Sequence, residues 1–64
     1  MNKTITMRLV GEDGNAFAII GRFQRQALRE GWTQNEIDAV LEDAMSDDYD
    51  NLLDVISQYV VEPD

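Results

Sequence analysis

The chain has 64 residues, of which 13 are Asp or Glu and five are Lys or Arg, and it contains neither His nor Cys. This length allows one domain. The missing imidazoles and thiols exclude Ser-His-Asp and Cys-His nucleophiles, disulfide bonds and the usual nitrogen and sulfur ligands of zinc. We therefore expect no enzyme, no cofactor and no metal site. A net charge of -8 repels nucleic acid and anionic membranes and favours basic protein partners.

The apolar segments are short. None approaches the roughly 18 residues of a membrane span, and no apolar segment precedes a small-residue cleavage site. The sequence thus predicts a cytoplasmic protein without a membrane span. A chain this small buries a limited core, so helix caps or a second copy must supplement its stability, and we expect a homodimer.

The first predicted element is a strand over residues 3–10 (KTITMRLV), in which apolar and polar side chains alternate. Its inward positions are Ile5, Met7 and Leu9. Residues 11–15 (GEDGN) then predict a turn, with Asn15 as the N-cap of a following helix.

A helix is predicted over residues 16–30, followed by Gly31 in the left-handed conformation that often ends helices. Gly21 costs about 1 kcal/mol relative to Ala in a helix interior, which predicts a close approach by another backbone. The side chains expected on the apolar face are Ala16, Phe17, Ile19, Ile20, Phe23 and Ala27.

The second predicted helix begins with a capping box, in which Thr33 is the N-cap and Glu36 the N3 residue. Trp32 precedes the cap and is expected to pack on Ile37 in the core rather than bind a ligand. The apolar face of this helix comprises Ile37, Val40, Leu41, Ala44 and Met45. Met7 and Met45 are expected to fill the core.

Residues 46–48 (SDD) offer three candidate N-cap residues for a third helix that starts at about Tyr49. We expect this helix to bury Tyr49, Leu52, Leu53 and Ile56. Residues 59–61 favour a short final strand, because Pro63 forbids further helix and the first strand needs a partner. The predicted fold is α+β, in the order β-α-α-α-β, with three helices on one face of a two-stranded sheet whose direction stays open.

The turn over residues 11–15 has the position of a phosphate-binding loop, between a strand and a helix N-terminus. It carries Glu12 and Asp13, lacks the Lys and the glycine spacing of nucleotide-binding loops, and lacks the acid spacing of a calcium loop. We interpret it as a turn with a cap. A ligand carrier that uses this loop and the nearby arginines is a further alternative, and it predicts saturable phosphate or nucleotide binding.

Charged side chains form two groups. Arg22, Arg25 and Arg29 lie within about 60° of one another on the first helix, and they predict a solvated face, a dimer contact or a recognition site. The acidic residues of the second helix, the connection and the third helix form a candidate partner-binding surface. These are Glu42, Asp43, Asp47, Asp48, Asp50 and Asp54. Capping and solubility explain several of them, whereas imitation of DNA is the alternative.

Two stretches carry a resemblance: GEDGNAFAIIG with the following Arg22, Arg25, Leu28 and Gly31, and EIDAVLEDAMSDDYDNLL. Over residues 9–53 the chain resembles a group of small acidic proteins from bacterial, phage and mobile-element genomes that have no assigned activity. The resemblance implies an accessory protein of a prophage or plasmid and transfers no site residue. Together with the composition, it leads us to expect protein-protein binding, with a nucleic-acid mimic that inhibits a host defence or transcription enzyme as the alternative.

Overall fold

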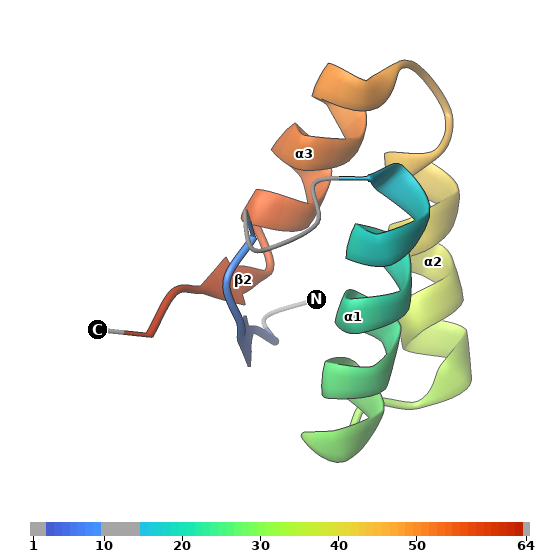
Figure 1. Ribbon diagram of the computed structural model, residues 1–64. Coiled ribbons are helices and arrows are strands. Elements are labelled where there is room, and N and C mark those ends of the chain that lie inside the picture. The colour runs from blue at the N-terminus through green and yellow to red at the C-terminus, as the bar shows by residue number, and fades with distance from the viewer. Residues whose placement is uncertain (1–2, 10–14, 64) are drawn as a thin grey trace.

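The computed structural model describes residues 3–9 and 15–63 (Figure 1). It confirms the predicted order β-α-α-α-β. The elements are β1 (Ile5–Thr6), α1 (Ala16–Arg29), α2 (Gln34–Ala44), α3 (Tyr49–Ser57) and β2 (Val60–Val61). Val10 and the predicted turn over residues 11–14 lie outside the described residues.

The two strands pair in parallel, with Ile5 opposite Val60 and Thr6 opposite Val61. The Ile5 amide donates to the Tyr59 carbonyl at 2.8 Å, and the Met7 amide donates to the Val61 carbonyl at 3.2 Å. A parallel pair needs a long crossover, which the three helices supply. Within the described residues, β1 is shorter than the predicted strand because β2 offers it a partner only two residues long.

The helix boundaries follow the predicted caps. The Asn15 side chain accepts a hydrogen bond from the Phe17 amide at 2.8 Å, and Gly31 has a φ of +93° after the C-cap residue Glu30. In the capping box, the Glu36 amide donates to the Thr33 hydroxyl at 3.2 Å and the Thr33 amide donates to the Glu36 carboxylate at 2.8 Å. These predictions are confirmed.

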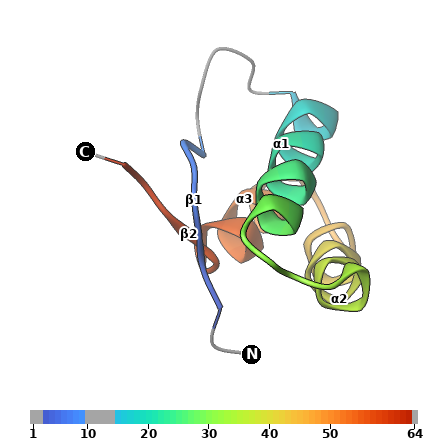
Figure 2. The same cartoon turned by 90° about the horizontal axis from the view of Figure 1, so that it is seen from below.

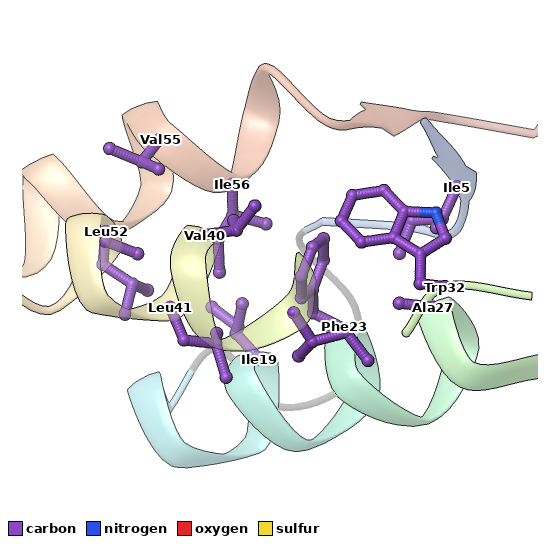
Figure 3. Close-up of a cluster of buried hydrophobic side chains, with 12 residues drawn as sticks. Ile5, Ile19, Phe23, Ala27, Trp32, Val40, Leu41, Leu52, Val55 and Ile56 are labelled. Atoms are coloured by element: carbon purple, nitrogen blue, oxygen red, sulfur yellow. The ribbon is translucent and has the colours of Figure 1, made fainter. Parts of the chain in front are cut away.

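Helices α1 and α3 pack directly on the strands, and α2 packs on α1 and α3 as an outer layer (Figure 2). The core between them contains side chains from four elements, seen in Figure 3. Its largest fully buried members are Phe23, Ile5, Ile19, Ile37 and Ile56.

Trp32 belongs to this core, as predicted, with 5% of its surface exposed. Its ring makes edge-to-face contacts with Phe23 at 5.6 Å and with Tyr59 at 6.0 Å between centroids. The contacts connect the α1–α2 junction to the residue before β2. Trp32 therefore joins the helical layer to the sheet.

Three side chains predicted to be buried are exposed: Phe17 by 83%, Met45 by 55% and Tyr49 by 44%. Phe17 lies about 120° around α1 from Phe23, at the edge of the apolar face. Met45 is the C-cap of α2 and Tyr49 is the first residue of α3, so both stand at helix ends.

Two further expectations need correction. The buried face of α3 includes Val55, which was not predicted, whereas Leu53 is half-buried. Gly21 has no close backbone neighbour among the described residues, since a Cβ built there meets only the Arg25 Nη1 atom, at 3.4 Å. Within the described residues, therefore, no close backbone approach accounts for this glycine.

Candidate functional site

A groove of about 260 Å³ opens where the first turn of α1 meets the C-terminal end of α2 and the start of α3. Its apolar lining includes all three side chains that the sequence wrongly assigned to the core. Ala16, Ile20, Ala44 and Leu52 complete this lining, and Asp47 and Asp48 are its acidic residues. The groove thus combines exposed aromatic and Met side chains with negative charge.

Side-chain hydrogen bonds to the backbone hold the α2–α3 connection, which forms one wall of the groove. The Ser46 hydroxyl donates to the Asp43 carbonyl at 2.7 Å. The Asn51 side-chain amide donates to the carbonyls of Asp43 and Ala44, at 3.1 and 3.2 Å. Because these bonds satisfy carbonyl groups at the end of α2, they fix the corner against the first turn of α3.

The carboxylates in the groove also shape the connection. The Asp48 side chain caps α3 by accepting from the Asn51 amide at 2.9 Å, which identifies the N-cap among the three candidates. The Asp47 side chain accepts from the Asp48 amide at 2.9 Å. Both residues are exposed, so each carboxylate has a local structural role and still faces solvent.

All six residues of the predicted acidic surface are exposed: Glu42, Asp43, Asp47, Asp48, Asp50 and Asp54. Within residues 3–9 and 15–63, the single ion pair joins Lys3 and Glu36, at 2.8 Å and away from this surface. The acidic surface therefore has no basic side chain paired to it within the described ranges. In addition, the last turn of α2 has no basic residue to offset the negative end of its dipole.

The three arginines of α1 do not have equivalent positions. Arg22 is half-buried and donates to the Arg8 carbonyl at 2.9 Å and to the Leu9 carbonyl at 3.2 Å, so it holds the segment after β1 against α1. Arg25 and Arg29 are exposed. A recognition role for Arg22, Arg25 and Arg29 together stays a prediction.

Three glutamates accept hydrogen bonds from residues far away in the sequence, contacts that the sequence analysis missed. One is Glu62, whose carboxylate accepts from the Leu9 amide at 3.2 Å. The Glu30 carboxylate accepts from the Thr6 amide at 2.9 Å and from the Gln26 side chain at 2.6 Å. The Thr6 backbone bond, followed by the Gln26 bond, lowers the pKa of Glu30. The pKa of Glu36 is lowered mainly by the hydrogen bond from Lys3, and next by that from the Thr33 backbone.

The structure also bears on the predictions about metal ligands and membrane spans. No cluster of three potential metal ligands occurs among the residues that the structure describes. Within the same ranges, none of the helices has the length and apolar character needed to cross a bilayer. The loop alternatives for phosphate or calcium concern Glu12 and Asp13, which lie outside those ranges.

Comparison with known proteins gives no assignment: no protein-family model, curated protein or solved structure matches the chain. The resemblance carried by GEDGNAF and DDYDNLL stays a prediction.

Proposed function

We propose that this chain is an accessory protein that acts by binding a basic protein through the acidic surface of α2 and α3. The observation that carries the proposal is the groove, where Phe17, Met45 and Tyr49 are exposed beside Asp47 and Asp48. Exposed apolar clusters with polar edges are typical of protein interaction sites. Aromatic and Met side chains are also enriched in the buried centres of such interfaces.

Charge defines the class of partner. The exposed acids around the groove attract Lys and Arg side chains and repel nucleic acid and anionic lipid. In a chain of net charge -8, this attraction also accelerates encounter with a basic protein at low salt. The proposal therefore names a basic protein, in the phage or plasmid setting that the sequence resemblance implies.

Imitation of nucleic acid is the second candidate, and the exposure of all six predicted acids favours it. A mimic needs carboxylates that replace phosphates, but it has no need of an apolar groove. The two candidates differ in salt dependence, because a purely ionic contact weakens far more steeply with added salt.

The experiment that tests the proposal compares partner capture by the wild type and by the double variant Asp47→Asn/Asp48→Asn. Asparagine retains the side-chain oxygen of each hydrogen bond and caps helices as well as aspartate does, so the variant loses charge without losing its fold. The matched control is Asp38→Asn/Glu62→Gln, which removes the same charge elsewhere. A protein captured by the wild type and the control but lost from the Asp47/Asp48 variant supports the proposal, whereas equal capture by all three contradicts it.

A further inference from the structure

We propose that the groove binds an amphipathic helix of a partner, with an apolar face that enters the groove and with Lys or Arg on its flanks. This inference rests on the proposed function and specifies the partner. It follows from the size of the groove, the positions of its charges and the hydrogen bonds that its walls already make.

The open form of the groove suits side chains of a protein. At about 260 Å³ it is smaller than the roughly 300–1,000 Å³ of typical small-molecule pockets, and it is open to solvent. Phe17 projects from α1 with 83% exposure, so it can pack beside an inserted side chain. Met45 has the flexible thioether that adapts to varied apolar shapes.

Within the described residues, the backbone carbonyls at the end of α2 offer few hydrogen bonds to an extended peptide. The carbonyls of Asp43 and Ala44 already accept from Ser46 and Asn51. The sheet lies elsewhere in the fold, against α1 and α3 and away from α2 (Figure 2). An extended segment would find few backbone partners in the described part of the groove, whereas a helix satisfies its backbone internally and contributes only side chains.

The charges at the groove define the flanks of that helix. Asp47 and Asp48 line the groove, no Lys or Arg does so, and the negative end of the α2 dipole points towards it at Ala44. A second copy that docked by this same face would bring its own Asp47 and Asp48 against these carboxylates. A partner with basic flanks removes this repulsion, so the geometry favours it over self-association across the groove.

The test uses a defined probe, a helical peptide of Leu and Lys about five turns long with one apolar face. Two control peptides accompany it: one with Glu in place of Lys, and one with Lys throughout and no apolar face. Binding is measured by calorimetry and located by amide chemical-shift changes in the full chain. Of the three peptides, we expect only the Leu/Lys peptide to bind well. It should cause the largest amide chemical-shift changes at residues 16–20 and 44–52.

Two variants of exposed residues on α1 separate the groove from general surface effects. Phe17→Ser removes a groove side chain, and Leu28→Gln removes an apolar side chain that does not line the groove. We expect Phe17→Ser to weaken peptide binding about tenfold or more, since aromatic side chains buried in an interface often carry much of its affinity. Leu28→Gln should remain within about twofold of the wild type.

Several outcomes overturn the inference. Equal binding of the all-Lys peptide, wild-type affinity of Phe17→Ser, or no binding of the Leu/Lys peptide would each contradict a helix in the groove. A dimer of the wild type that dissociates in Phe17→Ser would assign the groove to a second copy. If a captured partner is lost from Asp47→Asn/Asp48→Asn but kept by Phe17→Ser, the proposed function stands and the groove inference fails.

Discussion

Glu30 is the C-cap residue of α1, and its carboxylate also contacts β1. Its hydrogen bond from the Thr6 amide joins residues that are 24 positions apart in the chain. Such a contact has no local sequence signal, which is why it could not be predicted. The Thr6 amide faces away from β2, so Glu30 satisfies a donor on the open edge of the sheet.

This contact predicts a pH dependence. Because the folded state lowers the pKa of Glu30, the ionised carboxylate adds stability that is complete above the ordinary Glu pKa of about 4.3. That stability is lost as the pH falls through the lower folded pKa. We expect Glu30→Gln to be less stable than the wild type at neutral pH, and the difference in unfolding free energy to narrow in acid. Urea titrations at several pH values check this, and parallel pH profiles would contradict it.

Asp48 gives a prediction for a single cap. Asp48→Ala removes the acceptor for the Asn51 amide and should cost about 1 kcal/mol of unfolding free energy. Asp48→Asn keeps an equivalent cap and should lie within a few tenths of a kcal/mol of the wild type. Denaturant unfolding of both variants provides the measurement, and equal losses in the two would show that charge, not capping, stabilises α3.

At the scale of the elements, local chemistry determined what could be predicted. Asn15, Gly31 and the Thr33–Glu36 box each act within a few residues, and all three were confirmed. The parallel direction of the strands depends on how three helices pack, so it stayed open in the sequence. The groove was anticipated only in part: Asp47 and Asp48 were predicted as part of an acidic surface, whereas its exposed apolar side chains were assigned to the core.

Helix ends explain that misassignment. A helical wheel treats Met45 and Tyr49 as members of an apolar face, but the chain turns between them, and among the described residues no further helix or strand covers this end of the bundle (Figure 1). The hydrophobic periodicity of a sequence indicates on which side of a helix each side chain lies. It contains no information about where the neighbouring helices end. The groove therefore required the three-dimensional arrangement.

Gly21 provides a prediction for α1. Space for a Cβ exists, with contact only to the Nη1 atom at the end of the exposed Arg25 side chain. Because glycine costs about 1 kcal/mol relative to alanine in a helix interior, Gly21→Ala should raise the unfolding free energy by up to that amount. Thermal and denaturant unfolding check the result, and a destabilised variant would indicate a neighbour outside the described residues.

At the scale of the whole molecule, charge and size set the expected behaviour. The homodimer predicted from the small core stays a prediction, and like charges around the groove disfavour a contact through that face. Sedimentation over a wide concentration range tests it. We expect a dimer that persists in Phe17→Ser, and a monomer at high concentration would contradict the prediction.

The central claim is that the apolar groove and its carboxylates together recognise a basic, amphipathic partner. The most direct measurement is the affinity of the Leu/Lys helical peptide for the wild type, Phe17→Ser and Asp47→Asn/Asp48→Asn, each at low and high salt. We expect both variants to bind the peptide more weakly, and we expect the affinity of Asp47→Asn/Asp48→Asn to depend less on salt. Wild-type affinity and salt dependence in both variants would contradict it.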